Sequence, residues 1–344
     1  MRGLAAAMCH PQLESAMSTS ELDPNYSGPW HEGERAVQAR VGVRAQMEEV
    51  GLRVLRPYLP EQHRLFFNQL PFVIAGSVDT AGQPWASVLV NPPGFITSPD
   101  PEHLAVQAAP LAGDPLAHNL RPGAAIGLLG IEPHTRRRNR MNGVVEEVRD
   151  ESFTVRVSQS FGNCPKYIQA RKPVYADPVP EHAGTIHHGV TLDQAALAML
   201  RRADTLFIAT AYPETDAASA AGSRSHGVDV SHRGGKPGFV RVAADGTVTV
   251  PDFIGNQFYN TIGNLQVNPR AGLLLIDFDS GDLLYLAVDA QIIWDGPEVE
   301  AFDGAQRLLR FTVRQMQRSE AALPLRWGAA APSPYLDATG SWGG

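Results

Sequence analysis

Two neighbouring stretches of the sequence combine residue types that could bind a ligand joining a flat ring to a phosphate. Ser231–Val242 is basic and rich in glycine, and Pro251–Asn260 is rich in side-chain amides. The glycines at 234–235 would let backbone N–H groups approach an anion, and His232 or Arg233 would contribute charge. The alternative is a flexible surface hairpin that happens to be basic.

Asn256, Asn260 and Asn264 recur at every fourth position, which predicts that they share one face of a helix. Behind Gly255, that helix could hold a phosphate at its N-terminus, where backbone N–H groups and the helix dipole favour an anion. Asparagine also serves in helix caps and turns, so a structural role stays open. Because these amides carry no charge, positive charge would have to come from elsewhere.

The basic run 136–140 could supply that charge. Four arginines surround Asn139 there, and guanidinium groups bind phosphate oxygens in pairs. Arg138, Asn139 and Arg140 are the favoured candidates within the run. The alternative is a solvated turn between two strands, which is what a run of charges usually forms.

Asn163–Tyr167 and Pro324–Trp327 each place a basic–aromatic pair after a proline. Such a pair can stack on a ring and neutralise an anionic substrate. Cys164 could be a reactive thiol beside a lysine, although a small packed cysteine is commoner. The histidines at 182, 187 and 188 have no recognisable metal-ligand spacing, so no metal is expected. The candidate substrate-binding residues are Lys166, Tyr167, Arg326 and Trp327.

Helical periodicity covers Glu32 to about Leu59, with an end expected near Gly51. A connecting helix is expected over Thr191–Asp204, with Thr191 as its cap. Short strand patterns fill most of the remainder. Strands are expected near 71–78, 85–90, 104–107, 124–131, 143–148 and 153–158, and again at 205–210, at 271–276 and after a loop at 231–235.

The order of these patterns repeats, which predicts a duplicated β unit. The paired segments are Phe72 with Thr205–Thr210, Gln83–Ser87 with Lys236–Val240, His118–Leu120 with Gly263–Leu265, and Phe153–Arg156 with Phe311–Arg314. Antiparallel strands joined by hairpins favour a small barrel, because closure removes exposed edges. We expect a mainly β (α+β) fold of two tandem split β-barrels. A tail and helix would occupy 1–50, a first barrel unit 51–185 and a second 186–344. The alternative is two unrelated β domains.

Composition limits the function classes. The net charge of −7 argues against a general nucleic-acid binder, whose affinity rests on a cationic surface. No apolar run approaches the roughly 20 residues of a membrane span. Two cysteines cannot form a disulfide framework, which favours a reducing compartment, and a cytoplasmic protein is expected.

Several of these motifs resemble the pyridoxamine 5′-phosphate oxidase-related, FMN-binding split-barrel superfamily, and within it a bacterial branch with two barrels in one chain. The resemblance covers roughly residues 30–328. Its blocks are Trp30–Glu34, Ser160–Ile168, Ser231–Val242, Pro251–Thr261, Asn264, Asn268–Pro269 and Ser280–Leu283. In that superfamily two barrels pack side by side, and FMN lies in the groove between them, touched by both. The resemblance implies that this chain builds within itself the dimer that single-barrel relatives make from two chains.

The resemblance also implies which residues meet the cofactor. Main-chain atoms of 239–241 would lie along the flavin ring, and the comparable strand of one barrel would reach the flavin bound mainly by the other. Many relatives carry Lys or Arg near the amides of 256–260, where this chain does not. The implied FMN-binding residues are His232, Arg233, Gly234, Gly235, Phe239, Val240, Arg241, Asp252, Phe253, Asn256, Asn260, Arg138, Asn139 and Arg140.

The implied activity is FMN-dependent oxidoreduction of an unidentified small molecule or a reduced nicotinamide, in which the cofactor supplies the chemistry. No side chain stands out as an obligatory acid or base. The alternatives are a non-catalytic flavin carrier, sensor or electron-transfer partner, and a related barrel that binds haem or a deazaflavin. One flavin per chain is expected, because the first barrel lacks the glycines of 234–235. Further dimerisation of the chain is left open.

Overall fold

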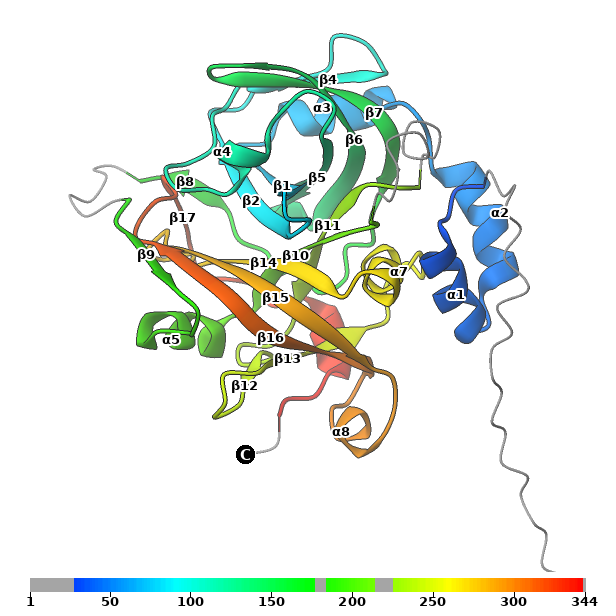
Figure 1. Cartoon of the computed structure of the whole chain (residues 1–344), viewed down its shortest axis with the longest axis vertical. Helices are drawn as coiled ribbons and strands as arrows, with labels where there is room; N and C mark the ends of the chain where they lie inside the picture. Colours follow the sequence, from blue (N-terminus) through cyan, green and yellow to red (C-terminus); the bar gives the residue numbers. More distant parts are fainter. Residues whose placement is uncertain (1–27, 177–183, 214–224, 343–344) are drawn as a thin grey trace, which may run out of the picture.

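The computed structural model describes residues 28–176, 184–213 and 225–342 (Figure 1). Two antiparallel units lie one above the other in that view, and two N-terminal helices flank them. This arrangement confirms the predicted fold class of two tandem split barrels with added helices. The expected tail up to residue 27 and His182 lie outside the described residues. Within the described ranges, no helix has the length and apolar character of a membrane span.

The first unit is a seven-stranded sheet in the order β2-β1-β5-β6-β7-β4-β3. Its opening hairpin turns at Asp79, whose side chain accepts hydrogen bonds from the backbone N–H groups of Ala81 and Gln83. The elements are α3 (Glu61–Asn68), β1 (Phe72–Val78), β2 (Pro84–Val90), β3 (Ile96–Thr97), β4 (His103–Val106), α4 (Leu116–Asn119), β5 (Ala125–Glu132), a 3₁₀ turn (Pro133–Thr135), β6 (Arg137–Arg149) and β7 (Ser152–Gly162).

The second unit repeats this order as β11-β10-β14-β15-β16-β13-β12, with β9 added against β16. Its connecting helix begins later than expected, because Asp193, not Thr191, caps it by accepting from Ala196 N at 2.6 Å. The elements are β9 (Ile186–Gly189), α5 (Gln194–Arg202), β10 (Thr205–Ala211), β11 (Val228–Gly234), β12 (Arg241–Val242), β13 (Val248–Phe253), α7 (Asn260–Val267), β14 (Arg270–Ile276), β15 (Leu283–Ile293), α8 (Pro297–Glu300) and β16 (Ala305–Ser319).

The equivalent strand orders confirm the predicted duplication, and a repeated hydrogen bond supports it. Asn119 of α4 donates to Ser77 Oγ at 2.9 Å, and Asn264 of α7 donates to Thr210 Oγ1 at 3.1 Å. These are the asparagines of the matched segments 118–120 and 263–265. The exact boundaries of the two units stay a prediction.

Two of the expected matches were wrong. The counterpart of β2 is β11, so Lys236–Val240, which lies beyond that strand, does not correspond to Gln83–Ser87. Phe153 lies opposite Val106, the last residue of β4, whereas Phe311 lies opposite Val248, the first residue of β13. The shared four letters therefore do not mark equivalent positions.

The two units pack face to face through β1, β2 and β5 of the first and β10, β11 and β14 of the second. An apolar cluster that includes Phe72, Trp85 and Phe207 fills this interface, separate from the core inside each unit. Two glycines let the backbones meet. A Cβ on Gly127 would lie 2.5 Å from Val228 O, and one on Gly272 would lie 2.3 Å from Pro84 O. These contacts occupy reciprocal positions and fix how the units sit against each other.

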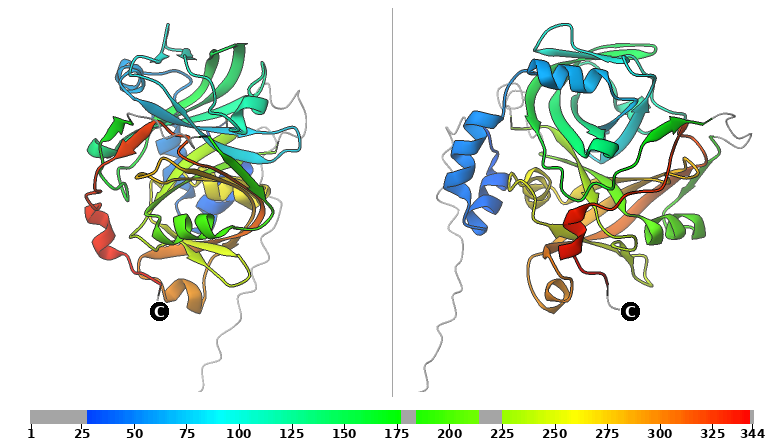
Figure 2. Two further views of the ribbon diagram at one scale, coloured as in Figure 1. Left: turned by 90° about the vertical axis from the view of Figure 1, so that its left-hand side faces the viewer. Right: turned by 180° about the vertical axis from the view of Figure 1, so that it is seen from behind.

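The expected N-terminal helix is two helices, α1 (Glu32–Arg40) and α2 (Arg44–Val54), on one flank of the molecule (Figure 2). They separate at Gly42, whose φ of 75° ends α1, and Gly51 lies inside α2 instead of ending the helix. Helix α1 lies against α7 of the second unit, where a Cβ on Gly33 would come within 2.2 Å of Gly263 O. The helices therefore touch at their backbones.

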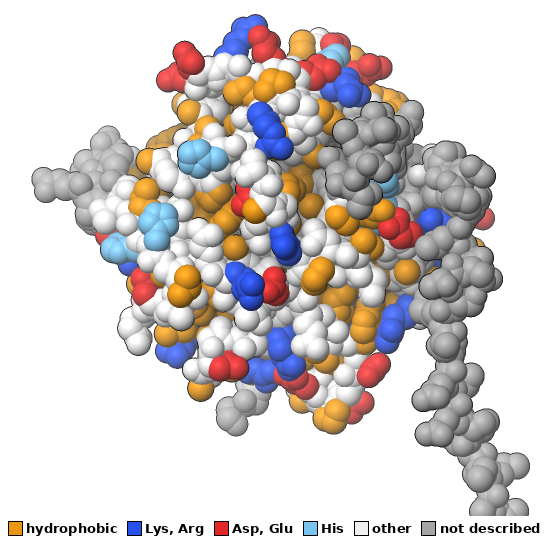
Figure 3. Space-filling model, in the orientation of Figure 1, with side chains coloured by type: hydrophobic (Ala, Val, Ile, Leu, Met, Phe, Trp, Pro, Cys, Tyr) orange, Lys and Arg blue, Asp and Glu red, His pale blue; other side chains and the backbone are white. Residues whose placement is uncertain are grey.

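The segment after each barrel crosses to the other unit. Strand β8 (Pro173–Tyr175) pairs with β17 (Leu325–Trp327), and a 3₁₀ turn (Pro334–Ala338) follows. The C-terminal residues run back over the second unit, where Trp342 Nε1 donates to Phe239 O at 2.8 Å (Figure 2). On the face shown in Figure 3, acidic and basic side chains of the described residues are interspersed rather than gathered by sign.

Candidate functional site

A small cleft of about 80 Å³ lies where strand β6 of the first unit meets β11, β13 and the start of α7 of the second. Strand side chains alternate between two faces, so Arg138 and Arg140 share one face of β6, and Ser231 and Arg233 share one face of β11. These two faces converge on the cleft. Its lining includes Arg138, Arg140, Asn163, Ser231, His232, Arg233, Asp252, Phe253, Asn256 and Asn260.

Arg140 is the buried centre of a hydrogen-bond network that joins the two units. Its Nη1 donates to Asp229 Oδ1 at 2.9 Å and to Asn260 Oδ1 at 3.0 Å, and its Nη2 donates to Ser231 Oγ. Asp229 also accepts from Asn142 Nδ2 at 2.8 Å. Removing one partner of such a buried pair would leave an unpaired charge, so this network holds the cleft together.

Arg138 differs from the other guanidinium groups of the cleft. Its Nε donates to the backbone carbonyl of Cys164 at 2.7 Å, but among the described residues no carboxylate pairs with it. Burial, together with the charges of Arg140 and Arg233, lowers the pKa of Arg138 to about 9. The group is still protonated at neutral pH, and a bound anion would relieve its repulsion.

The cleft as a whole carries excess positive charge. Asp252 pairs with Arg307 at 2.6 Å and with Arg233 at 3.3 Å, and Asp229 pairs with Arg140. Three guanidinium groups line the cleft, those of Arg138, Arg140 and Arg233, and Asp252 is the carboxylate among its lining residues. Outside the lining, Asp229 and Arg307 add one charge of each sign, so two positive charges stay uncompensated, which suits a doubly charged anion such as a phosphate monoester.

His232 does not contribute the positive charge expected of it. Burial, with the charges of Arg138, Arg233 and Arg171, holds its pKa well below the usual value, so the ring is neutral at pH 7. Its side chain alternates away from Ser231 and Arg233 and packs 5.8 Å from the ring of Phe207.

The expected basic loop at 231–235 is mostly strand β11, and its glycines meet protein instead of a ligand. A Cβ on Gly234 would lie 2.0 Å from Tyr167 O, and one on Gly235 would lie 2.4 Å from the Phe239 side chain. The residues of 163–169 cover this edge of β11, with Gln169 Nε2 donating to Gly235 O at 3.2 Å. The two glycines allow residues 163–169 to cover the edge of β11, and this close approach accounts for the glycines without a bound flavin.

Phe239, Val240 and Arg241 also lie away from the cleft. The first two belong to the core of the second unit, and the main-chain oxygen of Phe239 is bonded by Trp342. Arg241 pairs with Glu298 and lies over the Trp342 ring at 4.1 Å. A flavin ring along this segment, as the resemblance implied, would have to displace these contacts.

Three amides take other places than expected. Asn139 alternates to the opposite face of β6 from Arg138 and Arg140. Asn256 precedes α7 and accepts from Phe258 N at 3.2 Å, so it does not share a helix face with the other two asparagines. Asn264 is buried and donates to Asp229 Oδ2 at 2.9 Å. Of the three asparagines of the expected helix face, Asn256 and Asn260 line the cleft, and Asn264 does not.

Of the four candidate substrate-binding residues, two lie near the cleft and two lie away from it. Tyr167 lies 5.0 Å from Phe253 at the rim of the cleft, and Lys166 lies 5.5 Å from the Tyr335 ring. In contrast, Trp327 is 4% exposed and packs against Phe72 in the interface core. Arg326 donates to the backbone carbonyls of 323 and 325. Neither Arg326 nor Trp327 is placed to meet a ligand in the cleft.

The N-terminal helix, which begins within the resembling block Trp30–Glu34, contributes to the site, although no ligand-binding role was expected for it. Glu34 accepts from Asn260 Nδ2, and His31 caps α1 by accepting from Gly33 N at 3.1 Å. Burial lowers the pKa of His31 to about 4, so it is neutral at pH 7. A sequence signal existed: His31 followed three residues later by an acid is a capping-box spacing.

The equivalent place in the other half of the molecule holds different residues. Arg140 lies opposite Leu129 of β5, and its counterpart Tyr285 lies opposite Leu274 of β14. Tyr285 OH donates to Asp114 Oδ2 at 3.0 Å, and Ser87 Oγ, the counterpart of Ser231, donates to Asp114 Oδ1 at 2.5 Å. This buried triad closes the second position with neutral groups and one acid.

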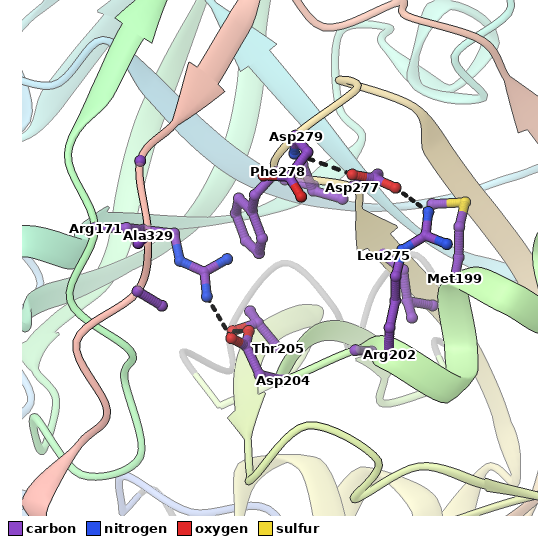
Figure 4. Close-up of a pocket in the computed structure, with 14 residues that line it drawn as sticks. Arg171, Met199, Arg202, Asp204, Thr205, Leu275, Asp277, Phe278, Asp279 and Ala329 are labelled. Atoms are coloured by element: carbon purple, nitrogen blue, oxygen red, sulfur yellow. Dashed lines mark hydrogen bonds and ion pairs between the residues drawn. The ribbon is translucent and has the colours of Figure 1, made fainter.

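A larger cavity of about 240 Å³ lies between α5, the β14–β15 turn and the C-terminal segment (Figure 4). Arg171 pairs with Asp204 and Arg202 pairs with Asp277 on opposite sides of it. Because each guanidinium has its own carboxylate, this cavity lacks the charge excess of the cleft. Among the described residues, no group of histidine, cysteine and acidic side chains could hold a metal ion.

In a comparison with known proteins, a family model matches part of the chain. Residues 59–179 match the family model of pyridoxamine 5′-phosphate oxidase. No curated protein matches the chain.

Three similar solved structures each cover about a third of this chain and nearly all of their own length. A Lactobacillus delbrueckii protein described as a candidate pyridoxamine 5′-phosphate oxidase is 19% identical, with 31% of this chain and 95% of that chain covered and a TM-score of 0.25. A single-residue variant of HupZ from group A Streptococcus is 15% identical over 36% and 98%, with a TM-score of 0.26. An F420 reductase is 12% identical over 31% and 97%, with a TM-score of 0.21. Similarity at this level informs neither the site nor the function.

Proposed function

The chain belongs to the pyridoxamine 5′-phosphate oxidase-like superfamily, and we propose that it is a flavoprotein that binds FMN in the cleft between its two units. Members of this superfamily commonly bind flavin. The observation that carries the proposal is the uncompensated Arg138, held beside Arg140 and Arg233 at the junction of β6 and β11. A phosphate monoester would supply the missing negative charge there.

The residues present fit the phosphate end of FMN. Arg138, Arg233 and Asn163 would hold it, and Nε of Arg233 and Nδ2 of Asn163 are buried donors without a partner among the described residues. A volume of about 80 Å³ suits a phosphate group and not a whole flavin, so rim residues such as Phe253 and Tyr167 would hold the ring.

The proposed activity is oxidoreduction of an unidentified small molecule or a reduced nicotinamide. When bound, FMN supplies the transfer of hydride or electrons. The chain's own residues bind and orient the cofactor, because the acids of the cleft are committed to ion pairs and His232 is neutral and buried. Bleaching of the flavin spectrum by NADPH or NADH would support an enzyme, and its absence would favour a flavin carrier.

The test compares FMN with riboflavin, which lacks the phosphate. Arg138→Ala should weaken FMN by about 30-fold, since a charge-assisted hydrogen bond contributes about 2 kcal/mol, and should leave riboflavin nearly unchanged. The matched control is Arg137→Ala, because Arg137 points to the other face of β6 and donates to Gln62 O. Its affinity for both ligands should equal that of the wild type.

Fluorescence titration measures both dissociation constants. Equal losses of FMN and riboflavin affinity in Arg138→Ala would show that this arginine only shapes the fold. A protein that takes up neither flavin would overturn the proposal, and a haem or deazaflavin spectrum of the purified protein would replace it.

A further inference from the structure

Glu34, in the first turn of α1, is buried against the cleft network although it does not line the cleft. Its Oε1 accepts from Asn260 Nδ2, and its Oε2 accepts from the backbone N–H of His31 at 3.1 Å. Asn260 also contacts Arg140, because its Oδ1 accepts from Arg140 Nη1 at 3.0 Å. A chain of hydrogen bonds therefore runs from the N-terminal helix to the central guanidinium.

The position of Asn260 between these partners decides which way its amide faces. The two ends of an amide are alike in shape but opposite in hydrogen bonding, so the partners determine its orientation. Glu34 offers an oxygen acceptor, which holds Nδ2, and this leaves Oδ1 for the guanidinium of Arg140, which can only donate. A turned amide would face Arg140 with two donors and repel it.

We propose that Glu34 is a positioning residue for the anion cleft, acting through the amide of Asn260 to hold Arg140 in place. The inference rests on the proposed function, because it concerns how the cleft receives the phosphate of FMN. It makes α1 a third contributor to the site, beside the two barrel units.

The electrostatics of Glu34 agree with this role. Burial and the nearby charge of Asp229 raise the pKa of Glu34 well above its usual value. A protonated carboxyl would still present an oxygen to Asn260, and it would not cancel the positive charge that the cleft keeps for its ligand. An ionised residue at this place would reduce that charge.

Gln38, one turn further along α1, supplies the matched control. It is fully buried, and its Nε2 donates to Phe258 O at 3.2 Å, in the loop that leads into α7. Its contact thus fastens the same helix to the same segment without bonding the Asn260 amide. Loss of helix docking alone should appear equally in variants of Gln38 and of Glu34.

The experiment titrates FMN, riboflavin and inorganic phosphate into the full-length wild type, Glu34→Ala, Glu34→Gln and Gln38→Ala, and records thermal unfolding of each. In Glu34→Ala, FMN and phosphate affinities should fall about tenfold while riboflavin changes by less than about twofold. Glu34→Gln should lose less, because one glutamine oxygen can still serve Asn260; it also carries the test if the alanine variant does not fold. Gln38→Ala should lower the unfolding temperature without changing the FMN-to-riboflavin ratio.

Two results would count against the inference or its premise separately. The role of Glu34 is overturned if both glutamate variants lower FMN and riboflavin affinity equally, as a purely structural contact would. If the wild type binds phosphate but no flavin, the proposed FMN function fails, and the phosphate titrations still decide the role of Glu34.

Discussion

At the scale of single residues, the two units carry side chains of different charge at one equivalent position. Arg140 and Tyr285 occupy equivalent places on β6 and β15, and Ser231 and Ser87 occupy equivalent places on β11 and β2. Arg140 brings a guanidinium group that pairs with Asp229, whereas Tyr285 brings a hydroxyl group that donates a hydrogen bond to Asp114. Sequence alone did not show this equivalence, because the match depends on strand register.

Asp114 leads to a prediction on pH. Burial raises its pKa to about 6 from a value near 3.8 in the unfolded chain. The folded protein therefore holds this proton between about pH 4 and 6 while the unfolded chain does not, so its stabilising effect is complete below about pH 4 and is lost as pH rises through 6. The loss amounts to about 3 kcal/mol.

Asp114→Asn should remove this decline, since asparagine does not titrate. Urea unfolding of the wild type and the variant between pH 4 and 7 measures the difference in unfolding free energy at each pH. That difference should shift in favour of the variant as pH rises. Parallel curves for the two proteins would show that Asp114 keeps an ordinary pKa.

At the scale of elements, the backbone contact of α1 with α7 decides whether the N-terminal helix reaches the cleft. Gly33→Ala would place a Cβ 2.2 Å from Gly263 O and 2.7 Å from Val267. We expect α1 to be displaced, at a cost of about 1–3 kcal/mol, and hydrogen exchange over residues 28–54 to quicken.

Ala39→Ser is the control for that variant, because Ala39 is exposed on the same helix. It should exchange like the wild type. Unchanged exchange in Gly33→Ala would mean that the helices can separate there without losing their contact.

The sequence predicted some strands and missed others, depending on how clearly the residue pattern of each strand differs from that of a loop. Apolar runs such as Ala125–Glu132 were found from sequence because buried strands need few polar residues. Strand β11 was missed because the glycines at 234–235 suggested a loop, although Val228, Val230 and His232 alternate with polar residues. That period of two was the available signal.

The site was predictable only in part, for a related reason. Arg138 and Arg140 could be proposed from charge alone, and the cleft does bring them to Arg233 across the unit interface. Whether Asn139 and Trp327 could reach a ligand depended on which face of its strand each side chain occupies. The place of Glu34 in the site depends on its contact with Asn260, which lies 226 positions away in sequence, and no local pattern predicts such a contact.

At the scale of the whole molecule, duplication supplies two equivalent junctions between the units, and the structure leaves only one of them basic. The junction of β6 and β11 carries the excess guanidinium charge, whereas the junction of β15 and β2 carries the buried Tyr285–Asp114–Ser87 triad. A second phosphate there would meet an acid and no guanidinium in that triad. We therefore expect one FMN per chain.

An equilibrium titration of the wild-type protein with FMN and with riboflavin tests most directly whether the cleft binds the phosphate of FMN. We expect one FMN per chain, bound at least about 30-fold more tightly than riboflavin, because the phosphate meets guanidinium charge that carboxylates do not fully compensate. Equal affinities for the two ligands, or two FMN per chain, would contradict this expectation.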